Sequence, residues 1–163
     1  AGLRPAFSKD GTITAGNSSQ ISDGASAVIV TSRAHADENG WPVLAVIGSA
    51  GQVAGPDNTL HAQPARAILA ACEREGITAS DLDFVEINEA FGAVVARSQA
   101  ELGLPDEVVN IHGGGIAIGH PIGASGNRLV VHTVYELLHR GGGTAAVALC
   151  GGGGQGDALI LKR

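Results

Sequence analysis

A single histidine, His120, stands in a stretch that is unusually rich in glycine, residues 113–126. Glycine loses the most backbone entropy on folding, so a chain accepts a glycine cluster where the backbone must turn tightly or approach a ligand. A second such stretch, residues 150–156, begins with Cys150. A histidine and a cysteine, each in its own glycine loop, are the components of a thiol-based active site.

The position of His120 favours a catalytic role over a structural one. A lone histidine is often a core residue whose ring is satisfied by the backbone. His120, however, follows an expected strand and precedes Pro121 and the start of an expected helix. Open α/β sheets build their sites at such carboxyl ends of strands. A neutral imidazole there could take a proton from a thiol or donate to a developing oxyanion.

The two cysteines lead to different expectations. Cys150 ends an apolar run, and the amides after it could stabilise a thiolate or an oxyanion, although a buried and inert cysteine is the alternative. Cys72 lies on the apolar face of an expected helix and is interpreted as a core residue. The glycines after Cys150 are not a dinucleotide fingerprint, because an apolar strand rather than a helix follows them.

Asn88 is the third candidate, in the sequence Asn-Glu-Ala-Phe at residues 88–91. It follows an expected strand, so its amide is either a helix cap or a fixed donor that holds a water or a carbonyl oxygen. Glu89 is expected to anchor the loop rather than to react. The histidines outside the glycine stretch lack the i, i+4 spacing of a metal pair, and no metal site is predicted.

The composition limits the classes of function. The 163 residues are 44% hydrophobic and carry a net charge of −6 without a basic stripe, which argues against nucleic-acid binding. No apolar run reaches the length of a membrane span. The two cysteines have neither metal nor redox spacing, so a cytoplasmic protein is expected. Methionine is absent and the chain starts at Ala1, which we interpret as a removed initiator or a piece of a longer polypeptide.

Hydrophobic periodicity predicts an α/β fold, a mixed five-stranded sheet covered by helices in the order β-α-β-α-β-α-β-β. A further buried strand at 27–30 and a short helix at 33–39 are expected before a boundary near Trp41. The three main helices are expected at 64–75, 90–102 and 125–139. The five strands of the sheet are expected at 43–47, 83–87, 107–111, 144–149 and 158–161.

Taken together, the three motifs resemble the C-terminal signatures of thiolases (acetyl-CoA C-acyltransferases). They lie at 88–91, 119–126 and 150–156, and residues 14–19 with 23–25 resemble a fourth thiolase segment. The resemblance covers essentially the whole chain. It implies a thiolase-like half-domain at 41–163, preceded at 1–40 by a remnant of the thiolase N-terminal half.

The resemblance also implies roles for individual residues. His120 would activate a nucleophilic cysteine and help to bind the thioester oxygen, and Asn88 would complete that oxyanion hole through a water. Cys150 would act as acid and base at the α-carbon of the second acyl-CoA, and the Gly152 amide would join a second oxyanion hole. The pantetheine channel of coenzyme A would be lined by Phe7, Ala15 and Ser19. Coenzyme A would be a substrate, with no permanently bound cofactor.

One departure from the family pattern decides what the isolated chain could do. The nucleophilic cysteine of thiolases lies in their first half, and Cys72 lies in the wrong element to replace it. The resemblance therefore implies acyl transfer by Claisen condensation or thiolytic cleavage of 3-oxoacyl-CoA, with an inactive isolated chain. An N-terminal half, from the same gene or a separate chain, would be the partner, and a homo-oligomer is expected at full length. The alternatives are a non-catalytic acyl-CoA or lipid-binding module and one subunit of a split thiolase. A smaller departure is His112, where many thiolases have asparagine.

Overall fold

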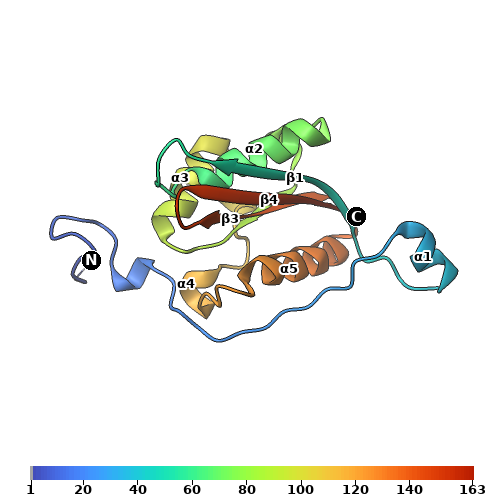
Figure 1. Ribbon diagram of the computed structural model, residues 1–163, viewed down its shortest axis with the longest axis horizontal. Coiled ribbons are helices and arrows are strands. Elements are labelled where there is room, and N and C mark those ends of the chain that lie inside the picture. Colours follow the sequence, from blue (N-terminus) through green and yellow to red (C-terminus); the bar gives the residue numbers. More distant parts are fainter. Residues whose placement is uncertain (1) are drawn as a thin grey trace.

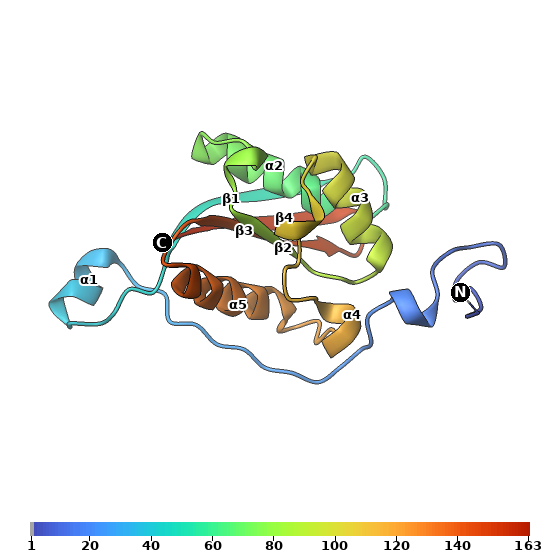
Figure 2. The same ribbon diagram turned by 180° about the vertical axis from the view of Figure 1, so that it is seen from behind.

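The computed structural model describes residues 2–163 and contains one mixed sheet. Its four strands run in the spatial order β1-β4-β3-β2 (Figures 1 and 2; β2 is labelled in Figure 2). The parallel pair β2 and β3 ends at the same edge of the sheet, whereas β4 is antiparallel to both β1 and β3. The strands are β1 (Val46–Ala54), β2 (Phe84–Ile87), β3 (Thr144–Gly151) and β4 (Gln155–Lys162).

Helices cover both faces of this sheet. Figures 1 and 2 show α2 (Gln63–Glu75) and α3 (Gly92–Leu102) on one side and α5 (Ser125–Arg140) on the other. The alternation of side chains along the strands sends one set to each layer. Val85, Ile87 and Ala146 therefore pack with α2, while Phe84 and Ala145 pack with α5. The mixed α/β class predicted from the sequence is confirmed.

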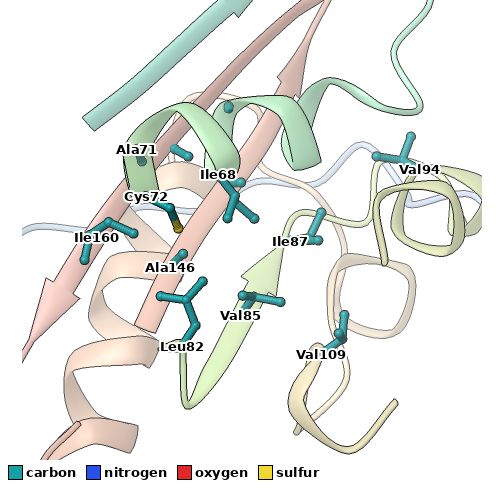
Figure 3. Close-up of a cluster of buried hydrophobic side chains, with 13 residues drawn as sticks. Ile68, Ala71, Cys72, Leu82, Val85, Ile87, Val94, Val109, Ala146 and Ile160 are labelled. Atoms are coloured by element: carbon teal, nitrogen blue, oxygen red, sulfur yellow. The ribbon is translucent and has the colours of Figure 1, made fainter. Parts of the chain in front are cut away.

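Cys72 belongs to the core between α2 and the sheet, as predicted. It is 2% exposed and lies with Ile68 of α2 beside Ala146 and Ile160 of the strands (Figure 3). Burial is the main cause that raises the pKa of its thiol. A buried cysteine with a raised pKa is a poor nucleophile, so Cys72 has the properties of a structural residue.

Two predictions about strands are wrong. The expected fifth strand at 107–111 is a 3-10 turn (Asp106–Val108) followed by a single bridge from Val109 to Val85. The reason is the left-handed backbone of Asn110, with φ 48°, which an extended strand does not allow. The expected buried strand at 27–30 is irregular and exposed, with Ile29 at 89%. Its apolar run has no neighbouring strand in residues 2–163.

The first strand also begins later than predicted and runs further, from Val46 to Ala54. The added part of the strand contains Gly48 and Gly51. Gly51 is in fact required by packing, because a Cβ there would lie 1.9 Å from the carbonyl oxygen of Ala67 in α2. The short helix expected at 33–39 is present as α1 (Arg33–Glu38), capped by the Ser32 hydroxyl.

The N-terminal segment runs along the outside of the α/β unit rather than within it. In both ribbon views it passes the side of α5 that faces away from the sheet (Figures 1 and 2). Asn127 of α5 donates a hydrogen bond of 2.8 Å to Ser26 in this segment. Among residues 2–163, none of the helices combines the length and the apolarity that crossing a membrane requires.

Candidate active site

The predicted site residues Asn88 and Cys150 lie at the edge of the sheet where β2 and β3 end. Asn88 directly follows β2, and its backbone N–H donates to the carbonyl of Ala148 in β3 at 2.9 Å. Cys150 lies two residues further along β3. This edge is where an open α/β sheet places functional groups, because parallel strands present their carboxyl ends together.

His120 reaches the same edge from the glycine loop. The loop contains a one-turn helix, α4 (Gly115–Ile118), which ends at Gly119 with φ 90°. The backbone N–H of His120 then donates to the carbonyl of Gln20 at 2.7 Å, so the N-terminal segment fixes the loop from outside. As a result, His120 Nε2 lies 3.3 Å from Asn88 Nδ2. The structure thus brings together two of the residues predicted to share an oxyanion hole.

A serine that the sequence analysis did not identify sets the tautomer of His120. His120 Nδ1 lies 2.6 Å from Ser125 Oγ, and this hydroxyl donates to the carbonyl of Pro121 at 3.0 Å. The hydroxyl has a single proton, so it must accept from Nδ1–H. We therefore assign the Nδ1–H tautomer, which leaves the lone pair of Nε2 facing Asn88 Nδ2. Nε2 is then the basic nitrogen of the site.

The surroundings of His120 keep its imidazole neutral. Burial is the larger cause that lowers its pKa, and the positive charge of Arg128 is the second. Arg128 lies close because its guanidinium donates to the carbonyl of Gly119 at 2.8 Å. A neutral imidazole with an unprotonated Nε2 can accept a proton from a thiol and then donate from the same atom to an anionic oxygen.

Asn88 is almost completely buried and only partly satisfied. It is 1% exposed, and its Oδ1 has no hydrogen-bond partner within residues 2–163. A buried polar atom without a partner is costly in a structural residue, and such atoms occur where a ligand or a water completes the bonding. This feature agrees with a functional amide and not with a helix cap, since α3 begins only at Gly92.

Cys150 differs from the sequence-based expectation. It is half-buried against the cluster beneath α2, and no hydrogen bond joins its Sγ to His120 or Asn88 within residues 2–163. Burial raises the pKa of its thiol, so stabilisation of a thiolate by the following amides is not the dominant effect. Gly152 lies in the exposed turn that joins β3 to β4, and a Cβ at this residue would have no atom within 4 Å.

The three residues expected to line a channel lie on the N-terminal segment. Ser19 donates to the carbonyl of Ala90 through both its backbone N–H, at 3.1 Å, and its hydroxyl, at 3.2 Å. The Phe7 ring packs edge-on against Phe91 with a centroid distance of 5.6 Å and stays 72% exposed. Ala15 begins an exposed 3-10 turn. Ser19 and Phe7 thus contact the loop that carries Asn88.

Glu89 anchors its loop, as the sequence predicted, but its partners could not be foreseen. Its carboxylate accepts from Ile116 N at 3.0 Å and from Asn110 Nδ2 at 3.2 Å. Asn110 and Ser125 were both missed. The available signals were weak: an asparagine shortly before a glycine run tolerates a left-handed backbone, and a hydroxyl at a helix start can bond back to a preceding turn.

Comparison with known proteins places this geometry in a family. The model of the thiolase C-terminal domain matches residues 41–163, and that of the thiolase N-terminal domain matches residues 1–34. A Mycolicibacterium smegmatis protein named "Probable acetyl-CoA acetyltransferase" is 62% identical over the whole chain. The chain spans 42% of the length of that relative.

Solved structures agree with this match. Bacillus anthracis acetyl-CoA acetyltransferase superposes with a TM-score of 0.95 at 40% identity, over 99% of this chain and 41% of that chain. Human mitochondrial 3-ketoacyl-CoA thiolase in complex with CoA gives a TM-score of 0.92 at 38% identity, over 99% and 41%. The match of fold, sequence and motifs extends over nearly all of the chain, which therefore belongs to the thiolase family.

Proposed function

We propose that this chain is the C-terminal part of an acyltransferase that condenses two acyl-CoA molecules or cleaves 3-oxoacyl-CoA with coenzyme A. The observation that carries the proposal is the contact between the neutral His120 and the buried Asn88, 3.3 Å apart, at the carboxyl end of β2. Claisen chemistry passes through an enolate next to a thioester, whose anionic oxygen needs preorganised donors in a site of low polarity.

His120 has the protonation state that the first half-reaction requires. Its Nε2 takes the proton of the nucleophilic cysteine, which attacks the thioester carbonyl and releases coenzyme A. Before coenzyme A leaves, the resulting Nε2–H donates to the anionic oxygen of the tetrahedral intermediate, and Asn88 contributes a second donor through a water. The proton taken from the cysteine then goes to the departing coenzyme A sulfur. Dividing the transfer into acylation and deacylation replaces one difficult step by two easier ones. The cysteine is proposed to come from the N-terminal half of a thiolase.

Cys150 is proposed to move the proton at the α-carbon of the second acyl group. The burial that raises the pKa of its thiol keeps it protonated near neutrality. A thiol is the form that donates a proton to the α-carbon when 3-oxoacyl-CoA is cleaved. In the condensation direction the thiol must first lose its proton, and the backbone amide of Gly152 then supports the enolate oxygen.

The N-terminal segment is proposed to bind the pantetheine of coenzyme A through Phe7, Ala15 and Ser19. The contacts of Ser19 and Phe7 with residues 90 and 91 support this role, since they place the segment beside the Asn88 loop. We also propose that residues 1–40 belong to the N-terminal half and residues 41–163 to the C-terminal domain. A homo-oligomer at full length and a cytoplasmic location complete the proposal, the latter supported by two free cysteines.

An assay of the purified chain with acetoacetyl-CoA and coenzyme A tests the assignment of the missing nucleophile. We expect no turnover, and no acetyl adduct in the intact mass after incubation with acetyl-CoA. Robust turnover by the chain alone would contradict the proposal. Binding of acyl-CoA without any exchange, even after an N-terminal thiolase half is added, would instead support a non-catalytic carrier.

A further inference from the structure

At the outer edge of β2, where no further strand pairs within residues 2–163, Asn110 makes the hydrogen bonds that a neighbouring strand would make. Its backbone N–H donates to the carbonyl of Val85 at 2.9 Å, after which the backbone turns left-handed. The side-chain amide then continues the ladder: Oδ1 accepts from Ile87 N at 2.7 Å and Nδ2 donates to Ile87 O at 2.9 Å. One side chain thereby satisfies both backbone groups of the last residue of β2, directly before Asn88.

The same amide also reaches Glu89, on the other side of Asn88 in the sequence. Asn110 Nδ2 donates to Glu89 Oε1 at 3.2 Å, and Glu89 Oε2 accepts from Ile116 N in α4 at 3.0 Å. The carboxylate lies so close to the glycine loop that a Cβ added at Gly114 would be only 2.7 Å from Glu89 Cδ. A side chain at position 114 would therefore displace Glu89. The bonded residues form a continuous path from the edge of β2 to the helix that ends immediately before Gly119 and His120.

We propose that Asn110 and Glu89 form a clasp that positions the two loops carrying Asn88 and His120 relative to each other. The clasp joins the residues on both sides of Asn88 to α4, which leads into His120. The N-terminal segment also bonds to both loops, through Ser19 to Ala90 and through Gln20 to His120, and the clasp adds a second tie from the opposite side of the sequence motif. The positioning role of Asn110 and Glu89 rests on the proposed function of His120 and Asn88. The hydrogen bonds of the clasp are independent of that function.

A purely local role would look different. If Asn110 only satisfied the edge of β2, it would need no bond to Glu89. If Glu89 only capped α4, it would need no bond to Asn110. Hydrogen bonds to a charged group are stronger than neutral ones, so the carboxylate is the natural centre of such a clasp. An amide at position 89 can accept only through one atom and must present a donor to the other partner.

Nuclear magnetic resonance of the 163-residue chain tests the clasp without enzymatic turnover. In the unmodified chain we expect the Ile116 amide and the Asn110 side-chain amide to exchange at least about tenfold more slowly than free amides. In Glu89→Gln we expect Ile116 exchange to accelerate about tenfold. The His120 ring shifts should change, and its titration should move towards the ordinary histidine value as the imidazole gains solvent. Glu107→Gln, at an exposed position of the neighbouring turn, is the matched control and should change neither reading.

The outcomes separate positioning from simple stability. A folded Glu89→Gln chain with unchanged Ile116 exchange and unchanged His120 titration would overturn the clasp. A loss of stability with an unchanged His120 titration would show a structural role only and would also overturn the positioning claim. If the variant does not fold, free-amide exchange of Ile116 in the unmodified chain is the result that contradicts the clasp. None of these readings depends on thiolase activity, so failure of the proposed function remains a separate result.

Discussion

His120 and Ser125 are joined by the shortest side-chain hydrogen bond in the site, 2.6 Å between Nδ1 and Oγ. The Ser125 hydroxyl in turn donates to the carbonyl of Pro121. Ser125 is completely buried at the start of α5. Its hydroxyl therefore determines which imidazole nitrogen carries the proton.

Ser125→Ala should shift the neutral imidazole of His120 towards the Nε2–H tautomer, because Nδ1–H loses its acceptor. Leaving a buried donor unpaired costs about 1–3 kcal/mol, so the free energy of unfolding should fall by that amount. Nitrogen chemical shifts of the ring report the tautomer, and urea denaturation reports the stability. Ser8→Ala, at an exposed serine, is the control; an unchanged tautomer in Ser125→Ala would refute this role of Ser125.

Gly119→Ala should disrupt the attachment of the His120 loop to the N-terminal segment. Gly119 has φ 90°, and a Cβ there would lie 2.0 Å from Ser22 Oγ. Such backbone strain costs about 1–3 kcal/mol before the clash is added. Thermal and urea unfolding should show the loss. Gly123→Ala in the same loop is the control, because no atom lies within 4 Å of its Cβ position and its φ is not left-handed. Equal stability of the two variants would contradict the prediction.

His132 of α5 should make the fold more stable at low pH than at high pH. Its Nε2 lies 3.4 Å from Oε1 of the buried Glu86, and this pairing is the largest cause that raises the pKa of His132 above 6.5. Glu136 acts in the same direction, whereas burial and Arg128 oppose it. The His112 ring packs edge-on against the His132 ring, with the two ring centroids 5.5 Å apart. A raised pKa in the folded state stabilises below the unfolded value and loses this effect as the pH rises through the folded value.

The comparison with His132→Gln isolates this contribution. The difference in free energy of unfolding between the two proteins should be larger at about pH 5.5 than at about pH 8.5. His120, whose lowered pKa acts in the opposite direction, is present in both proteins and cancels. A difference that is constant with pH would exclude the pairing.

The two cysteines should differ in their reaction with iodoacetamide. Cys150 is half-buried with a raised pKa, so its alkylation should accelerate about tenfold per pH unit between about pH 7 and pH 9, without a plateau. Cys72, at 2% exposed, should stay unmodified in the folded chain. Mass spectrometry of tryptic peptides distinguishes them, and Cys150→Ser is the control for the site of reaction. A plateau near neutral pH would indicate a stabilised thiolate and contradict the burial effect.

The sequence predicted those parts of the fold that local patterns determine. The helix at 64–75 has Pro64 in its first turn and Gly76 in a left-handed cap, and it appears as α2. Asn88 follows β2 as expected, but His120 reaches the same edge of the sheet from the glycine loop and α4 rather than from the strand that the sequence predicted. What failed depended on distant contacts. The apolar run at 27–30 has the composition of a strand, but no strand pairs with it in residues 2–163. At the outer edge of β2, where a strand was predicted, the Asn110 side chain instead makes the hydrogen bonds to Ile87.

The most direct test of the central claim is thiolysis of acetoacetyl-CoA by a fusion of this chain to the N-terminal half of the 62%-identical Mycolicibacterium smegmatis relative. We predict that the fusion cleaves acetoacetyl-CoA while the chain alone does not. His120→Ala in the fusion should lower kcat by about 10²–10⁴-fold, the usual contribution of an acid–base group. A folded fusion that binds acyl-CoA but does not cleave it, or one whose kcat is unchanged by His120→Ala, would contradict the account.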